Sequence, residues 1–96
     1  MLPVRRLRET RYVVAFHHPR PAYAVHVLIV PKRVVPNLLA LNDATLPVLH
    51  DVLRVAQQLV DELQLTAPGY RLIVNGGAYQ DVPQLHFHLI SGRGQW

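Results

Sequence analysis

One helix-type pattern limits what this chain can fold into. Between residues 46 and 63, apolar residues recur at spacings of three and four: Leu46, Leu49, Leu53, Ala56, Val60 and Leu63. This period predicts a single amphipathic helix, which Asp43 or Thr45 can cap and which ends before Pro68 and Gly69. A second apolar stripe runs beside the first and makes the face wider than packing on one sheet requires: Val48, Val52, Val55 and Leu59. We therefore expect part of this face to contact a second subunit.

The remaining patterns are typical of strands. Residues 11–16, 25–30 and 70–75 are rich in β-branched and aromatic residues, and glycines or prolines follow each of them. The nearly continuous apolar run at 25–30 predicts a central strand with both faces covered. Residues 84–90, with the sequence QLHFHLI, alternate polar and apolar side chains, which predicts a strand antiparallel to the one at 70–75. A weaker strand pattern covers residues 4–7.

Length and composition narrow the class of protein. The 96 residues fit one domain covering 1–96, and 50% hydrophobic against 17% charged residues excludes a disordered chain. So much apolar surface on a small chain favours a homodimer. The absence of cysteine excludes disulfides and thiolate chemistry. No apolar run is long enough to span a bilayer or to form a signal peptide, so we expect a cytoplasmic protein with no membrane partner.

A basic cluster lies near the N-terminus. The formal net charge is +4, and four arginines fall within seven positions: Arg5, Arg6, Arg8 and Arg11. Such a cluster can attract phosphates or nucleic acid. No aromatic stacking platform or basic helix accompanies it, so we interpret it as a solvated strand edge and expect no nucleic-acid partner.

Two histidines on the last predicted strand are the best candidates for chemistry. On a strand over 84–90, Gln84, His86 and His88 share one face. Imidazoles on a rigid element can act as nucleophile, proton carrier or metal ligand, although two histidines spaced by two also occur as ordinary residues of a half-exposed strand. Asn75 would lie near this row, or would simply close the turn before Gly76. His26, within an apolar strand, is typical of a hydrogen-bonded core residue, or of a residue that orients another polar group.

Several segments in order resemble the histidine-triad (HIT) nucleotide-binding and hydrolase family. The sequence QLHFHLI is similar to the family signature His-φ-His-φ-His-φ-φ, where φ is apolar, with Gln84 in the first position. HVLIVPK at 26–32 is similar to its H-φ-φ-φ-φ-P-K segment, and GYRLIVN at 69–75 to its GYR-φ-φ-φ-N strand. Gly92, Arg93 and Trp96 resemble the tail of the purine-nucleotide phosphoramidase branch. The resemblance covers the chain from about Leu2 onward.

The resemblance implies a fold and an activity. The fold is α+β, with an antiparallel sheet of about five strands, one long helix, and a homodimer whose sheets join into a continuous one. The activity is that of a nucleotide-binding hydrolase or transferase, which cleaves a nucleoside phosphoramidate or anhydride at the α-phosphorus through a nucleotidyl-histidine. The partner is then a small nucleotide, expected to be a purine nucleotide. No cofactor and no metal is expected.

The resemblance also implies roles for individual residues. His86 takes the position of the middle histidine, which attacks phosphorus, and a neutral imidazole suits this step. His88 takes the third position, which contacts phosphate oxygens or donates a proton to the leaving group. Asn75 matches an asparagine that hydrogen-bonds near the phosphate, and His26 matches a histidine behind the triad.

Three positions depart from the family pattern, and we assign all three to substrate binding. Gln84 replaces the first histidine and cannot exchange a proton. His18 stands where an aspartate often holds the ribose hydroxyls, and Asp81 stands where a hydroxyl usually approaches the phosphate. Besides an active hydrolase, two alternatives stay open. One is a catalytically weakened nucleotide-binding module of the same fold, and the other is a metal site formed by Asp81, His86 and His88.

Overall fold

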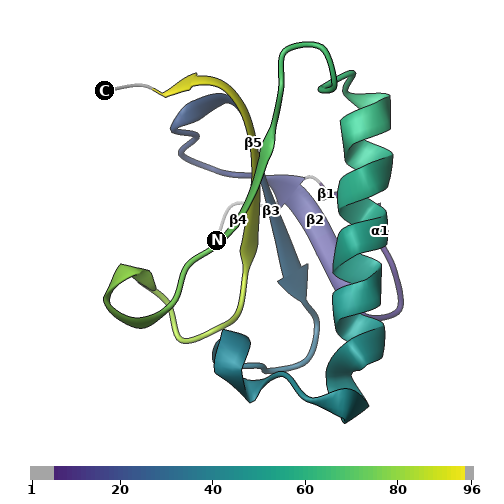
Figure 1. Cartoon of the computed structure of the whole chain (residues 1–96), viewed down its shortest axis with the longest axis vertical. Coiled ribbons are helices and arrows are strands. Elements are labelled where there is room, and N and C mark those ends of the chain that lie inside the picture. The colour runs from purple at the N-terminus through teal and green to yellow at the C-terminus, as the bar shows by residue number, and fades with distance from the viewer. Residues whose placement is uncertain (1–5, 95–96) are drawn as a thin grey trace.

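The computed structural model describes residues 6–94, which form a five-stranded antiparallel sheet with one long helix on one face (Figure 1). The strands are β1 (Arg6–Glu9), β2 (Val13–His17), β3 (Tyr23–Pro31), β4 (Arg71–Val74) and β5 (Phe87–Gly94), and the helix is α1 (Leu46–Glu62). Short 3-10 turns are η1 (Leu38–Ala40), η2 (Asp43–Thr45) and η3 (Gly77–Tyr79). The strand order is β1-β2-β3-β5-β4. The predicted α+β fold, the central position of β3 and the antiparallel β4–β5 pair are confirmed.

The helix covers the sheet with a different stripe from the one that its spacing first suggested. Val48, Val52, Val55, Ala56 and Leu59 are buried against the sheet. Two members of the stripe that we expected to cover the sheet are largely exposed, Leu46 at 55% and Leu53 at 47%. A helical period identifies an apolar face but does not decide which of two adjacent stripes lies at its centre. If a second subunit contacts the helix, it would therefore cover the exposed members of the first stripe, Leu46 and Leu53, and not the buried second stripe.

The chain enters the helix through η2, and this corrects the predicted cap. Neither Asp43 nor Thr45 caps α1 with its side chain. Instead, the Asn42 side chain accepts a hydrogen bond from the Ala44 amide at 2.9 Å, and the Asn42 amide donates to the Thr45 hydroxyl at 2.8 Å. This reciprocal pair occupies the hydroxyl of Thr45, the residue directly before the helix. Pro47 lies in the first helical turn, where its missing amide hydrogen would have no partner within the helix.

The histidine strand begins three residues later than predicted. β5 starts at Phe87, because the preceding backbone bonds the loop after β3 and not the sheet. The Leu85 amide donates to the Val35 carbonyl at 2.7 Å. The Gln84 side chain accepts from the Val35 amide at 3.1 Å. The prediction of a strand from residue 84 is therefore wrong, although Gln84, His86 and His88 still line one cavity.

The face of the sheet opposite α1 lies open to the site. On β3, Val27 and Ile29 are buried on the helix side, whereas Leu28 and Val30 are only half-buried on the other. The expectation that both faces of this strand are covered is wrong. In Figure 1 the helix lies on one side of the sheet, and the chain from β4 to β5 loops out past the end of the strands. This loop and the open face form the candidate site.

The basic N-terminal cluster is largely paired in the part that the structure describes. Arg6 forms an ion pair with Glu9 at 2.6 Å, Arg8 forms one with Glu62, and Arg11 lies over the ring of Tyr12. Arg5 and the first part of the weak strand pattern at 4–7 lie outside the described residues. The pairing agrees with a solvated strand edge. Among residues 6–94, no helix is both long and apolar enough to cross a bilayer.

Candidate active site

Six of the seven site residues predicted from the sequence line one cavity of about 320 Å³ on the open face of the sheet. This cavity is bounded by β3, by the start of β5 and by the loop between β4 and β5. The six predicted residues line it together with four others: His18, Asn75, Asp81, Gln84, His86 and His88, with Leu28, Val30, Tyr79 and Val82. The seventh residue, His26, lines an adjoining cavity of about 220 Å³ that shares Asn75 and His88 with the first. Residues from distant parts of the sequence therefore meet at one place.

The apolar part of the lining is not among the residues predicted from the sequence. Leu28 and Val30 follow His26 at spacings of two, so they occupy the same face of β3. That spacing is a signal from which both residues could have been found. Tyr79, 82% exposed on η3, carried no comparable signal.

The imidazole of His86 is oriented by the backbone just before it. Its Nδ1 lies 2.8 Å from the carbonyl oxygen of Gln84. Because a carbonyl only accepts, we assign the ring proton of neutral His86 to Nδ1. The lone pair of Nε2 is then available for attack on an electrophile in the cavity. This is the arrangement that a nucleophilic imidazole needs.

A chain of hydrogen bonds fixes the proton of His88 on the opposite nitrogen. The Ala22 amide donates to Nδ1 of His26 at 3.1 Å, so neutral His26 carries its proton on Nε2. That nitrogen lies 2.8 Å from Nδ1 of His88 and donates to it. Neutral His88 then carries its own proton on Nε2. The ring centroids of His86 and His88 lie 5.1 Å apart, and the two rings meet edge to face.

Burial lowers the pKa of three histidines at the site: His18, His26 and His88. Burial, and then repulsion from His86, His26 and His18 in their cationic forms, lowers the pKa of His88 to about 4, while Asp81 weakly opposes the shift. Burial also lowers the pKa of His26 and of His18. At neutral pH these three imidazoles are uncharged. His88 is thus available as a hydrogen-bond donor but very seldom as a cation.

His18 packs near the same histidines, and the family resemblance predicts for it a contact with the ribose, which stays a prediction. Its ring centroid lies 4.4 Å from that of His26 and 6.3 Å from that of His88. Its Nδ1 accepts from the Arg20 amide at 3.0 Å, which leaves the proton of the neutral ring on Nε2. His18 therefore offers a ligand one N–H donor, whereas an aspartate would offer two acceptor oxygens. His17, beside it, is exposed.

Gln84 uses most of its hydrogen-bonding capacity on the loop after β3. Its amide nitrogen donates to the carbonyls of Pro31 at 3.2 Å and Arg33 at 3.0 Å, and its oxygen accepts from the Val35 amide. Both amide hydrogens are then occupied. Phosphate oxygens only accept, so Gln84 has no hydrogen to offer them while these bonds last. These contacts favour a role in holding the segment that carries His86.

Asp81 is exposed and lines the same cavity as Asn75. Across residues 6–94, no group of three histidine or acidic side chains is close enough to hold a metal ion. The site of Asp81, His86 and His88 that we considered for a metal therefore lacks the required geometry. The Asp81 carboxylate is instead a negative charge in the same cavity as the neutral imidazoles of His18 and His88.

A sheet with one covering helix, and a row of imidazoles on its open face, define a class of protein, and the comparisons identify that class. A family model described as "HIT domain" matches residues 2–95, so the chain belongs to the HIT family. Two solved structures resemble it over nearly their whole length. One is a HIT family hydrolase from Legionella pneumophila, with TM-score 0.88 and 32% identity, covering 99% of this chain and 88% of that one. The other is a HIT family hydrolase from Clostridium thermocellum, with TM-score 0.87 and 38% identity, covering 95% and 81%.

A third solved structure is described by its ligand class. It is a histidine triad nucleotide-binding protein from Candida albicans, with TM-score 0.83 and 33% identity, and the match covers 96% of this chain and 68% of that one. Among the sequence relatives is a HIT-like protein from Azospirillum brasilense described as uncharacterized, 30% identical over 95 residues, which are 96% of this chain and 78% of that protein.

Proposed function

We propose that this protein is a nucleotide-binding hydrolase or transferase that cleaves a nucleoside phosphoramidate or anhydride at the α-phosphorus through a nucleotidyl-His86 intermediate. The hydrogen bond from Nδ1 of His86 to the Gln84 carbonyl is the observation that carries this proposal, because it leaves Nε2 as a nucleophile. The family membership and the names of its hydrolase and nucleotide-binding neighbours support it.

The proposed reaction has two displacement steps. In the first, the lone pair of His86 Nε2 forms a bond to phosphorus as the bond from phosphorus to the leaving group breaks. An amine leaving group takes up a proton from solvent. In the second, water attacks phosphorus, the N–P bond breaks, and the proton lost by water returns to solvent. The products are a nucleoside monophosphate and the free leaving group, and His86 is regenerated.

His88 takes the phosphate-contacting role of the two that the resemblance implied. With a pKa of about 4, the cationic form that would act as an efficient acid is rare at pH 7. The neutral ring holds its proton on Nε2, where it can donate a hydrogen bond to a phosphoryl oxygen as negative charge develops there. Asn75, on the wall of both cavities, supplies a second neutral donor.

The proposal is tested by incubating the protein with adenosine 5′-phosphoramidate and following release of AMP. The wild-type chain should turn over, and His86→Ala should abolish turnover. His17→Ala serves as the matched control, because His17 is an exposed histidine that lines neither cavity. Equal turnover by wild type and His86→Ala would contradict the mechanism.

Asp81 supports a second candidate, a binding module with weakened turnover. A carboxylate at the cavity repels the phosphate by about 1 to 3 kcal/mol at roughly 6 Å and an effective dielectric between 80 and 20. This module should bind AMP in calorimetry while hydrolysing no member of a panel of phosphoramidates and anhydrides. Asp81→Asn should then tighten AMP binding, and brisk turnover of any panel member by the wild type would exclude the module.

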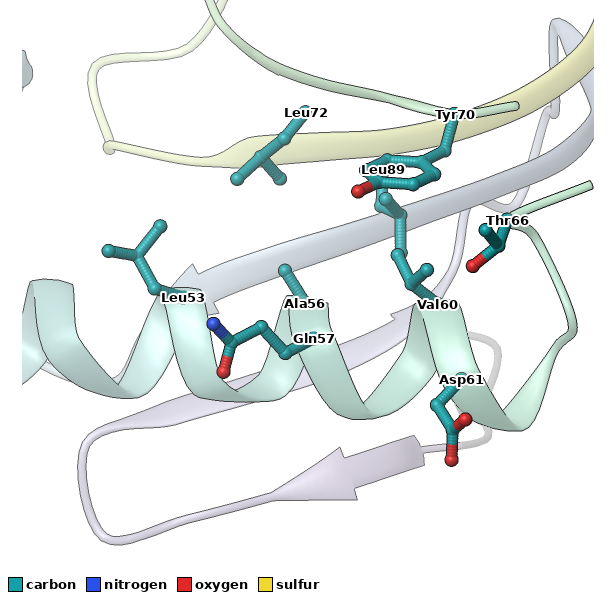
Figure 2. A pocket seen from close by; sticks show the side chains of 9 residues that line it. All are labelled: Leu53, Ala56, Gln57, Val60, Asp61, Thr66, Tyr70, Leu72 and Leu89. Atoms are coloured by element: carbon teal, nitrogen blue, oxygen red, sulfur yellow. The ribbon is translucent and has the colours of Figure 1, made fainter.

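We also propose a homodimer in which the sheets of two copies join along β4. The outer strand β1 carries charged Arg6, Arg8 and Glu9, which protect an edge from further pairing. β4, at the other edge, has the sequence RLIV, in which Arg71 at the start is the single charged residue and three apolar residues follow. Beside it, a cavity of about 410 Å³ separates β4 from α1. Figure 2 shows Leu53 on the helix and Tyr70 and Leu72 on the strand side facing this gap.

Pairing along β4 would bring the exposed apolar groups of both copies together. Leu53, Tyr70 and Leu72 are 47%, 52% and 36% exposed in the single chain. Leu72→Asp should therefore convert a dimer to a monomer in sedimentation experiments. Leu39→Asp is the matched control, since Leu39 is 91% exposed on η1, away from this edge. A monomeric wild type at all concentrations would exclude the dimer.

A further inference from the structure

The candidate site of a single chain has no cationic side chain for its anionic substrate. Within the described residues, the two adjoining cavities are lined by no lysine or arginine. His88 is held neutral, and Asp81 adds a negative charge. Phosphoryl substrates are generally bound by arginine or lysine as well as by neutral donors. If the proposed function is correct, a cation supplied by another chain would strengthen the binding of this substrate.

Arg71 is placed on the face of the sheet that carries the site. It pairs with Ile90 across the β4–β5 ladder, and Val74 pairs with Phe87, so Asn75 lies at the level of His86. Arg71 and Asn75 differ by four positions and share a face, at a separation of about 13 Å along the strand. The exposed Arg71 side chain makes no ion pair or hydrogen bond within residues 6–94. At that separation the Arg71 side chain does not reach Asn75 of its own chain.

Joining two copies along β4 brings this arginine close to the site of the other chain. A two-fold axis perpendicular to the sheet pairs the two β4 strands antiparallel and keeps both helices on the same face. Directly opposite residues of an antiparallel ladder point to the same face of the sheet, and side chains alternate between the two faces along a strand. A residue of one β4 can therefore lie opposite a residue of the partner's β4 only if their residue numbers are equal or differ by an even number. The pairings centred on Leu72 and on Ile73 keep most of the strand paired. Centring on Arg71 would instead oppose two like charges.

Both of these registers bring the arginine to the same place. Centring on Ile73 puts the partner's Arg71 directly opposite Asn75, with Cβ atoms about 5 Å apart. Centring on Leu72 puts the partner's Arg71 diagonal to Asn75, at about 7–8 Å. Asn75 lines the cavity together with His86 and Asp81. An arginine side chain is long enough to cover either distance and reach the cavity.

We propose that Arg71 acts in trans: in the β4-paired dimer, the partner's Arg71 enters the cavity beside Asn75 and binds the substrate phosphate, completing a site that one chain leaves without a cation. The guanidinium offsets the charge of Asp81 and can hold two phosphoryl oxygens at once. The charge complementarity between the partner's Arg71 and Asp81 also favours this mode of pairing.

Mixed dimers test the proposal directly. Arg71→Ala should lower kcat/KM for adenosine 5′-phosphoramidate about ten-fold or more while remaining dimeric, and the loss should shrink at high salt. His86→Ala should be inactive. After subunit exchange between equal amounts of the two variants, half of the dimers are mixed. Each mixed dimer has one site with both His86 and the partner's Arg71, so activity should recover to about a quarter of the wild-type value.

The same experiment contains the results that overturn the proposal. If Arg71 serves its own chain, the mixed dimer has no complete site and mixing gives no recovery. Full activity of Arg71→Ala alone would also overturn it. Arg93→Ala is the matched control, because Arg93 lies with Arg71 around a neighbouring cavity of about 520 Å³ but lines neither cavity of the site. It should keep wild-type kcat/KM.

A binding measurement separates this proposal from the proposed hydrolysis. If the wild type hydrolyses no substrate but binds AMP, the trans arginine predicts about ten-fold weaker AMP binding for Arg71→Ala and for the monomeric Leu72→Asp. Leu72 points toward α1 and not into the site, so its effect would act through the dimer. Unchanged AMP affinity in both variants overturns the trans arginine and leaves the nucleotide site itself intact. A wild type that neither hydrolyses nor binds nucleotide removes both proposals.

Discussion

The hydrogen bonds of His26 lead to a prediction that two substitutions at one position can test. His26 accepts from the Ala22 amide at 3.1 Å and donates to Nδ1 of His88 at 2.8 Å. A glutamine can reproduce both bonds, because its oxygen accepts and its nitrogen donates. A leucine of similar size can reproduce neither. His26→Gln should therefore keep the proton of His88 on Nε2, and His26→Leu should release it.

The size of the effect follows from the two bonds that leucine removes. Leaving a buried donor or acceptor unpaired costs about 1–3 kcal/mol, and His26 is only 7% exposed. Without the hydrogen bond from residue 26, the proton of neutral His88 is no longer held on Nε2. A loss of about 1.4 kcal/mol of transition-state stabilisation then gives a ten-fold fall in kcat. We expect His26→Leu to lower kcat about ten-fold and the melting temperature by several degrees.

The assay compares kcat for adenosine 5′-phosphoramidate in wild type, His26→Gln and His26→Leu, at pH 7 and at a temperature where all three are folded. His26→Gln should stay within about three-fold of wild type. Nitrogen-15 NMR of the imidazoles should show Nε2 of His88 protonated in wild type and His26→Gln, and a mixture of tautomers in His26→Leu. Equal kcat for the two variants, or unchanged tautomers in His26→Leu, would refute the hydrogen-bond chain.

Three further predictions concern stability. The folded-state pKa of His88 is about 4 and its unfolded value about 6.5, so the unfolded chain binds more protons between these values. The free energy of unfolding should fall by about 1–2 kcal/mol as pH drops from 6.5 to 4, after allowing for the half-exposed ring. Calorimetric melting over this pH range should show a smaller fall in His88→Gln than in wild type. Gln84→Leu should cost about 1–3 kcal/mol in urea unfolding by unpairing the loop after β3, and a loss under about 0.5 kcal/mol would show those bonds to be unimportant. Gly92→Ala should lower the melting temperature, because Gly92 has φ +84° and an added Cβ would lie 2.6 Å from Cβ of Ala24; unchanged melting would contradict that contact.

Periodicity and strand composition predicted the sheet, the helix and their approximate bounds. The helix was found because its apolar residues repeat every three or four positions, but two adjacent stripes fit that pattern. Only packing shows that Val52 is buried while Leu53 is largely exposed. Likewise, alternation over 84–90 predicted a shared face for His86 and His88 but not that Gln84 bonds a distant loop.

The histidine, amide and carboxylate members of the candidate site were predictable, whereas its apolar lining, Tyr79 and its electrostatics were not predicted. The resemblance to the HIT family brought His18, Asn75 and Asp81 together with the histidines, and the structure places them around one cavity. The protonation pattern depends on the Ala22 amide, a backbone group that no side-chain pattern reveals. The lowered pKa of His88 depends on burial under residues far away in the sequence.

The central claim is that Nε2 of His86 forms a covalent bond to phosphorus. Rapid acid-free quenching of the protein with adenosine 5′-phosphoramidate, followed by intact mass and peptide mapping, measures this directly. We expect an adenylyl adduct that maps to His86, forms and decays at rates compatible with kcat, and is missing in His86→Ala. Steady turnover with no adduct on the millisecond to second timescale, or an adduct on His88 or His18, would contradict it.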